Sequence, residues 1–228
     1  MRKALIAALL LTMLPGCAMS PRERAERNRP LAANPSAIIA AELAFNRLAQ
    51  DKGMVAAFRE TAHKEAVMFV PQRVRALDWL RTGNLGSGIS WAPHAVYTSC
   101  DGSAGATTGA WRGPSGSYGY FTTVWLREKD GSFKWVLDHG APLTTAPREA
   151  PEFIDGRQAA CGSRPAVGID TGGEGDDLAI GLAADQTLSW RSLVRRDGSR
   201  RITIGMWDGN AMQPVIDDDV TAAQARSQ

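Results

Sequence analysis

The chain has 228 residues, which is typical of one large domain or of one domain with an appendage. Hydrophobic residues make up 44% of the sequence, enough for a packed core, and the formal net charge is +2. This charge balance argues against the strongly basic surface of a nucleic-acid-binding protein, so no nucleic-acid partner is expected.

The N-terminus has the pattern of an export signal. A basic start at residues 2–3 precedes an almost wholly apolar run at 4–14, which ends in Leu-Pro-Gly-Cys at 14–17. The run has the length of a signal-peptide core and is too short to span a membrane. The last four residues resemble the lipobox of bacterial lipoproteins. That resemblance implies a lipid thioether on Cys17 and cleavage before it.

The lipobox predicts a signal peptide at 1–16 and a lipidated tether at 17–35. Ala18 resembles the residue found in lipoproteins sorted to the outer membrane, so we expect an exported protein that faces the periplasm from a membrane anchor. Two or more acyl chains would make that anchor stable. Two alternatives stay open: cleavage after Ala18 would release a soluble protein, or Cys17 simply belongs to the apolar run.

Helices are expected next. Asn34 is a good N-cap and Pro35 suits the first helical position. Apolar residues then recur at helical spacing until residues 51–53. A second short helix carries Met54 and Phe58, a strand covers 66–70, and a third helix spans about 74–83.

An antiparallel meander is expected from residue 86 to 140, with turns at Asp101-Gly102, residues 114–116 and Asp130-Gly131. A proline-containing linker at 142–160 follows. Strands near 188–196, 200–207 and 211–216 predict a C-terminal antiparallel β extension at 161–217. The acidic run at 217–219 predicts a flexible tail at 218–228.

Helices followed by a meander indicate an α+β fold. Residues 36–141 resemble the nuclear-transport-factor-2-like (SnoaL-like) superfamily, in which three helices and a bent antiparallel sheet form a cone. The resemblance rests on Glu-Leu-Ala-Phe at 42–45, Ala-Val-Met-Phe-Val-Pro at 66–71, Tyr-Phe-Thr-Thr-Val-Trp at 120–125 and Trp-Val-Leu-Asp at 135–138. The superfamily contains isomerases, dehydratases, hydrolases and non-catalytic binding modules, so the fold does not choose a function.

The candidate catalytic residues are Asp138 and His139. The resemblance implies an acidic base just before the proline that follows the first strand, but Val70 occupies that position. Asp138 ends a strand and precedes His139, and such a pair can do acid–base work, with Tyr120 as a hydrogen-bond donor. The competing interpretation is that Asp138 only caps or pairs at a strand end. The three histidines lack metal-ligand spacing, so neither a metal nor a cofactor is expected.

Aromatic residues in the cone segment are candidates for lining a small-molecule pocket. They are Phe45, Phe58, Trp79, Trp91, Trp111, Tyr120, Trp125 and Trp135. The competing interpretation is that they only fill the core. Along 118–126, Tyr120 and Phe121 must face opposite sides of the sheet, but the pattern leaves open which side lines the cone.

Cys100 and Cys161 are the two cysteines left after lipidation of Cys17. An even pair in an exported protein predicts a disulfide, which would hold the C-terminal extension against the cone. The alternative is two unrelated buried thiols.

Three functions follow from these patterns. The first is a non-enzymatic, lipid-anchored domain that binds a small apolar ligand or a partner protein. The second is an isomerase- or dehydratase-like enzyme with Asp138 as its base. The third is a structural envelope component that forms homodimers through the sheet. A cavity that Asp138 enters favours the enzyme, a cavity without inward carboxylates favours binding, and a filled cone favours the structural role.

Overall fold

The computed structural model describes residues 33–162, 173 and 175–226, all within the compact unit Leu31–Gln228. This unit is α+β, with a large, mostly antiparallel sheet, a second smaller sheet and a few short helices. The predicted signal peptide, the lipidation site Cys17 and nearly all of the tether lie outside the described residues. No helix within the described ranges is long and apolar enough to cross a membrane.

The first two helices begin and end where the sequence predicts. Helix α2 (Pro35–Lys52) starts after Asn34, whose side chain accepts a hydrogen bond from the Ser36 backbone N–H at 3.0 Å. It ends at Gly53, whose positive φ of 86° suits glycine. Helix α3 (Met54–Thr61) follows directly. The buried face of α2 holds four residues at helical spacing: Ile38, Glu42, Phe45 and Ala49.

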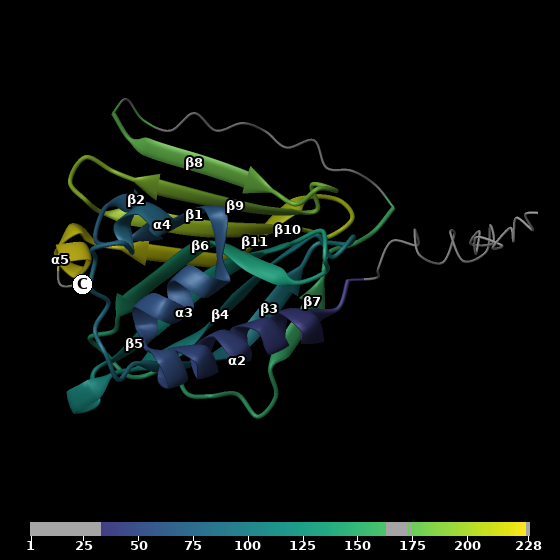
Figure 1. Cartoon of the computed structure of the whole chain (residues 1–228). Coiled ribbons are helices and arrows are strands. Elements are labelled where there is room, and N and C mark those ends of the chain that lie inside the picture. The colour runs from purple at the N-terminus through teal and green to yellow at the C-terminus, as the bar shows by residue number, and fades with distance from the viewer. Residues whose placement is uncertain (1–32, 163–172, 174, 227–228) are drawn as a thin grey trace, which may run out of the picture. The chain divides into compact units, whose positions relative to one another are not determined.

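The larger sheet has seven strands in the order β2-β1-β6-β5-β4-β3-β7. Neighbours are antiparallel except for the parallel pairs β1–β6 and β3–β7. Helices α2 and α3 cover one face of this sheet (Figure 1). The strands are β1 (Ala62–Phe69), β2 (Arg73–Arg75), β3 (Ser90–Thr98), β4 (Ala104–Arg112), β5 (Tyr118–Arg127), β6 (Phe133–Pro142) and β7 (Asp155–Gln158).

A β-bulge in β6 decides which side chains face the helices. Trp125 of β5 pairs with Trp135, but Val124 pairs with Leu137, so β6 carries one extra residue between them. Trp135 faces the helices and donates to the Phe58 carbonyl at 3.2 Å. After the bulge the alternation is reversed, so Leu137 faces away from the helices.

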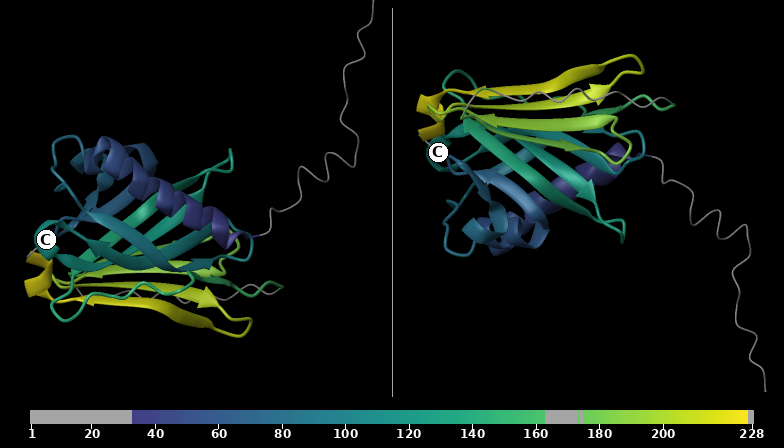
Figure 2. Two further views of the ribbon diagram at one scale, coloured as in Figure 1. Left: turned by 90° about the horizontal axis from the view of Figure 1, so that it is seen from below. Right: turned by 90° about the horizontal axis from the view of Figure 1, so that it is seen from above.

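A second sheet of four antiparallel strands, in the order β11-β10-β9-β8, packs on the other face of the large sheet (Figure 2). Val124 and Leu137 of the large sheet share an apolar cluster with Leu188, Ile202 and Ile204 of the small one. The strands are β8 (Asp177–Leu182), β9 (Leu188–Val194), β10 (Arg200–Trp207) and β11 (Met212–Val220).

A buried arginine also joins the two sheets. Arg200 of β10 is fully buried and donates to the backbone carbonyls of Pro71 and Gly140, each at 3.0 Å. Its Nε donates to Nδ1 of His139 at 3.2 Å. Burial lowers the pKa of Arg200 to about 10, so the guanidinium stays charged at neutral pH. These bonds fix the position of the small sheet, because each joins Arg200 to one specific atom of Pro71, Gly140 or His139.

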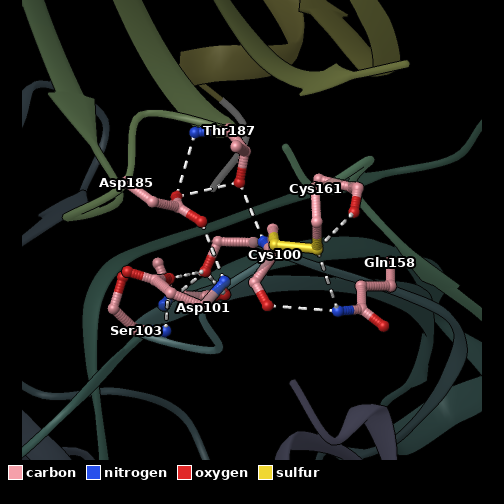
Figure 3. The surroundings of a disulfide bond; sticks show 10 residues. Cys100, Asp101, Ser103, Gln158, Cys161, Asp185 and Thr187 are labelled. Carbon is pink, nitrogen blue, oxygen red and sulfur yellow. Dashed lines mark hydrogen bonds between the residues drawn. A yellow bond between two sulfur atoms is a disulfide. The ribbon is translucent and has the colours of Figure 1, made fainter. Parts of the chain in front are cut away.

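The disulfide between Cys100 and Cys161 lies at the edge where both sheets meet (Figure 3). Around it, the β3–β4 turn is hydrogen-bonded to the β8–β9 turn. The Cys100 N–H donates to Thr187 Oγ1 and the Asp101 N–H donates to Asp185 Oδ2, both at 2.8 Å. The β3–β4 turn is therefore held at two places: the disulfide joins it to the segment after β7, and two hydrogen bonds join it to the β8–β9 turn.

The expected β extension at 161–217 contains one strand more than the sequence analysis names, and the last strand runs beyond it. Residues 177–182, for which the sequence analysis names no strand, form the fourth strand β8. The prediction of a flexible tail from residue 218 is wrong for 218–226. Strand β11 continues to Val220, and helix α5 (Ala222–Arg226) buries Ala225. The physical reason is strand alternation, which directs Asp218 toward the large sheet, where Thr122 donates to it at 2.6 Å.

Two other segments differ from the sequence prediction. The expected linker at 142–160 contains β7, which pairs in parallel with Ala95–Thr98 of β3. The third helix is a single turn, α4 (Ala76–Trp79), because β2 takes up the residues before it. Between β4 and β5 lies a short 3-10 turn, η1 (Pro114–Gly116).

Replacing Cys100 and Cys161 together by serine should lower the free energy of unfolding by about 4 kcal/mol, because the bond closes a loop with a sequence separation of 61. Urea unfolding of the double variant and of the reduced wild type should give the same value. The apolar cluster and Arg200 remain, so the small sheet should stay docked. Two free thiols in non-reducing mass spectrometry of the wild type would contradict the bond.

Candidate functional site

A cavity of about 130 Å³ lies between the helices and the large sheet. Its walls come from α2, α3, β3, β4, β5, β6 and the segment before β3. The lining is aromatic and aliphatic except at the end formed by β6. The lining residues are Phe45, Met54, Phe58, Ile89, Trp91, Trp111, Phe121, Asp138, His139 and Gly140.

The apolar walls are held by edge-to-face aromatic contacts. The ring of Phe45 lies 4.7 Å from that of Phe58 and 4.8 Å from that of Trp91, between centroids. Trp111 is only partly buried, and its Nε1–H donates to no residue that the structure describes. A Cβ built on Gly140 would lie 3.6 Å from that nitrogen. The cavity therefore has rigid aromatic walls and a free N–H donor beside β6.

Asp138 supplies the carboxyl group of the cavity. Thr123 on the neighbouring strand donates to its Oδ2 at 2.8 Å. Burial raises the pKa of Asp138 to about 7, a shift that the Thr123 hydrogen bond opposes and the nearby Glu42 carboxylate increases. The side chain keeps some exposure, which fits its position in the cavity wall. Both protonation states are therefore populated near neutral pH, as acid–base catalysis requires.

Glu42 lies in the protein interior, fully buried, and holds the aromatic walls in place. Its Oε1 accepts from Trp91 Nε1 at 2.6 Å, and its Oε2 accepts from Trp125 Nε1 at 3.0 Å and Thr107 Oγ1 at 2.5 Å. Burial raises the pKa of Glu42, and the three hydrogen bonds oppose that rise. One carboxyl group thus connects α2 with β3, β4 and β5.

Two threonines, Thr107 and Thr123, lie between Glu42 and Asp138. Thr107 Oγ1, which contacts Glu42, also lies 3.3 Å from the Thr123 carbonyl oxygen. The Thr123 hydroxyl then donates to Asp138. Glu42, one layer deeper than the cavity wall, therefore contributes to the raised pKa of Asp138.

Half of the aromatic residues predicted to line a pocket do so. Phe45, Phe58, Trp91 and Trp111 line the cavity. The other tryptophans belong to the surrounding core: Trp79, Trp125 and Trp135. Tyr120 lies on the opposite face of β5, with Ala141, Val220 and Ala225, so it does not face the cavity.

The sequence predicts Asp138 and His139 as a catalytic pair, but the structure does not bring their side chains together. Consecutive strand residues point to opposite faces, so Asp138 lines the cavity while the His139 ring lies between the sheets. That ring contacts Phe69 and Tyr120 edge-on, each with a 5.8 Å centroid separation. Burial, with the charges of Arg200 and Arg148, holds the pKa of His139 well below its usual range. His139 is therefore a neutral partner of Arg200.

Glu42 is the residue of this site that the sequence prediction did not single out. Its signal was present: Ile38, Glu42 and Phe45 share one face of the amphipathic helix. A carboxylate on an apolar face that precedes several tryptophans indicates a buried acceptor, because tryptophan can only donate through its ring nitrogen. Among the residues that the structure describes, no group of three or more histidine, cysteine, aspartate or glutamate side chains is arranged to hold a metal.

Three solved structures are similar to this chain. Candidate ketosteroid isomerases from Parabacteroides distasonis ATCC 8503 and Shewanella frigidimarina NCIMB 400 are 12% and 18% identical, with TM-scores of 0.41 and 0.35. They cover 51% and 45% of this chain and 98% and 94% of their own. A candidate aromatic-ring hydroxylase from Novosphingobium aromaticivorans DSM is 12% identical with a TM-score of 0.35, over 50% of this chain and 92% of its own.

No family model matches the sequence, and the search of curated proteins found no match. The arrangement of α2, α3 and the large sheet in this structure is consistent with a nuclear-transport-factor-2-like fold.

Replacing Glu42 by alanine should lower the free energy of unfolding by about 3–5 kcal/mol, because two indole N–H groups and one hydroxyl lose a buried acceptor. Glu42→Gln should cost about 1–3 kcal/mol, because an amide nitrogen cannot accept from an N–H donor. Glu60→Ala on the exposed face of α3 is the control. Equal urea midpoints for the Glu42→Ala and Glu60→Ala variants would contradict this role.

Proposed function

We propose that the cavity binds a small, largely apolar molecule with a single polar group that contacts Asp138. The observation that carries this proposal is an aromatic cavity with one carboxyl group at its end. Binding pockets for small molecules combine apolar walls with a few polar groups that orient the ligand. The existence of the cavity argues against a purely structural role, for which a filled interior was expected.

The size of the cavity supports a ligand of about one ring. Its volume of about 130 Å³ is close to the roughly 150 Å³ of an engineered apolar cavity that binds benzene. Phe45 and Phe58 are buried, whereas Met54, Ile89 and Trp111 are partly exposed. A ligand would therefore lie against the buried rings and pass the partly exposed side chains on entry.

Phenol and toluene test this proposal, because they have similar size and differ in one hydroxyl group. Both should give saturable changes in tryptophan fluorescence, since Trp91 and Trp111 line the cavity. Asp138→Leu should weaken phenol binding about tenfold, equivalent to one hydrogen bond of about 1.4 kcal/mol, and should change toluene binding little. Asp130→Asn, in the exposed β5–β6 turn, is the matched control. No saturable signal from either compound would overturn the proposal.

A second candidate function, acid–base catalysis on the same ligand class, rests on Asp138. A carboxyl group with a pKa of about 7 can take a proton from carbon and return it, provided that a donor stabilises the oxygen that gains charge. The Trp111 Nε1–H beside Gly140, which has no acceptor among the described residues, is such a donor. Tyr120, the donor expected from the sequence, faces the other side of β5.

Hydrogen–deuterium exchange at the α-carbon of cyclohexanone tests this candidate by NMR. The reaction needs ionised Asp138, so the catalysed rate should rise with pH and level off above about 7. Asp138→Asn should abolish the catalysed exchange, and Asp130→Asn should retain it. If Asp138→Asn leaves the rate unchanged, the acid–base role is wrong although ligand binding can still stand.

We also propose that the protein is exported and anchored by lipid on Cys17, with the cone facing the periplasm. The Cys100–Cys161 disulfide supports an oxidising compartment. The outer face of the large sheet is occupied by the small sheet, so a homodimer would have to use another surface than the one expected. The proposal also includes a partner protein, which would bind at such a surface.

Metabolic labelling with a fatty-acid precursor tests the anchor. The wild-type chain should carry the label and partition with membranes, whereas Cys17→Ala should do neither, because the thioether cannot form. The double serine variant of Cys100 and Cys161 is the control, since it retains Cys17. An unlabelled wild type, or label that survives in Cys17→Ala, would overturn the anchor.

A further inference from the structure

A second cavity, of about 260 Å³, lies where β3 is not covered by a neighbouring strand. Strand β7 pairs only with Ala95–Thr98, so the first half of β3 has no partner on that side. The segment after β6 approaches this region and contributes Arg148. The lining residues are Asn46, Ser90, Trp91, Ala92, His94, Ala110, Arg112, Arg148 and Ala150. Only Trp91 is shared with the cone cavity.

The lining is basic. Arg112 and Arg148 are permanently charged, His94 adds an imidazole, and no carboxylate lines the cavity. Arg112 is exposed, and its guanidinium group makes no hydrogen bond or ion pair within the part of the chain that the structure describes. This cavity thus combines two guanidinium groups with no lining acid.

Arg148 is held in position but is incompletely satisfied. Its guanidinium carbon lies 4.3 Å from the centre of the Tyr120 ring, which fixes its plane. Its polar contacts are long: 3.4 Å to Thr108 Oγ1 and 3.8 Å to Asp218 Oδ1. Asp218 is buried, and burial raises its pKa to about 6, so it is a weak counterion in mild acid. An arginine has five N–H donors, and several of these are left for a ligand.

The neutral side chains of the cavity also suit a ligand that accepts hydrogen bonds. Asn46 Oδ1 accepts from the Trp91 backbone N–H and from Gln50 Nε2, each at 3.3 Å. Those two bonds occupy the oxygen, so the amide N–H₂ group is the one left to donate. Burial, and then the charge of Arg148, lower the pKa of His94, so its ring is neutral at pH 7 and can donate one N–H.

We propose that this cavity is a binding site for a small oxyanion, a carboxylate or phosphate group held by Arg112 and Arg148. Planar guanidinium groups match both oxyanions through paired hydrogen bonds. The site is separate from the cone cavity and goes beyond the function proposed for that cavity. An anion bound here would offset the charge of Arg148, which lowers the pKa of His94, and so would raise the pKa of that imidazole.

NMR of the protein with ¹⁵N-labelled histidine tests the site, with inorganic phosphate and succinate as probes and chloride at equal ionic strength as reference. One or both probes should shift the His94 ring signals saturably and raise the pKa of His94. His63 lies outside the cavity and should not respond. A response to one probe alone assigns the site to that oxyanion.

Arg112→Gln is the decisive variant, because the exposed guanidinium group of Arg112 has no partner among the described residues, so its loss should leave the fold intact. It should weaken binding about tenfold, the effect of one charge-assisted hydrogen bond. Arg59→Gln on α3, also exposed, is the matched control. Arg148→Lys should weaken binding as well, because lysine keeps the charge but loses the planar fork.

Three results would overturn the proposal: no saturable shift of His94 with either probe, the same shift with chloride, or equal affinities in the Arg112→Gln and Arg59→Gln variants.

Discussion

One buried carboxyl group organises the described part of this protein. Glu42 is fully enclosed and is stabilised there only by three donors from three strands of the large sheet. A carboxyl group in an apolar interior is costly unless such donors surround it, so this interaction fixes the position of α2 on the sheet. Trp91 is bound to Glu42 and also lines the cone cavity. The same group increases the pKa of Asp138. Glu42 therefore influences both the shape of the cavity and the pKa of the carboxyl group at its end.

The bulge in β6 is the second constraint. It reverses the alternation of the strand, so that Trp135 and Asp138 both face the helices although three positions separate them. His139 then lies in the layer between the sheets, where it accepts a hydrogen bond from Arg200. Two adjacent titratable residues thus have opposite environments. The pKa of Asp138 in the cavity wall is about 7, near neutral pH. Burial holds the pKa of His139 well below its usual range, so that ring is neutral.

The small sheet gives the large sheet a second covered face. Apolar contacts, Arg200 and Asp218 join the two sheets, and two hydrogen bonds join the β3–β4 turn to the β8–β9 turn. Burial of both faces explains why β5 has apolar or threonine side chains on both sides along most of its length. It also leaves Tyr120 and Arg148 stacked at the margin of the interface, beside the basic cavity.

The sequence alone predicted the helix starting at Pro35, the meander, the α+β class and the cysteine pair that the structure joins. These follow from local signals: caps, spacing of apolar residues, turn residues and the count of cysteines. Four of the eight aromatic candidates line the cavity, and Asp138 faces it. Only the tertiary structure decided which face of each strand points inward, because one extra residue in β6 changes the alternation without a local signal. It also decided that Glu42 and Asp218 are buried and that Arg112 and Arg148 share a cavity. Burial and charge pairing depend on segments far apart in the chain, which no sequence pattern brings together.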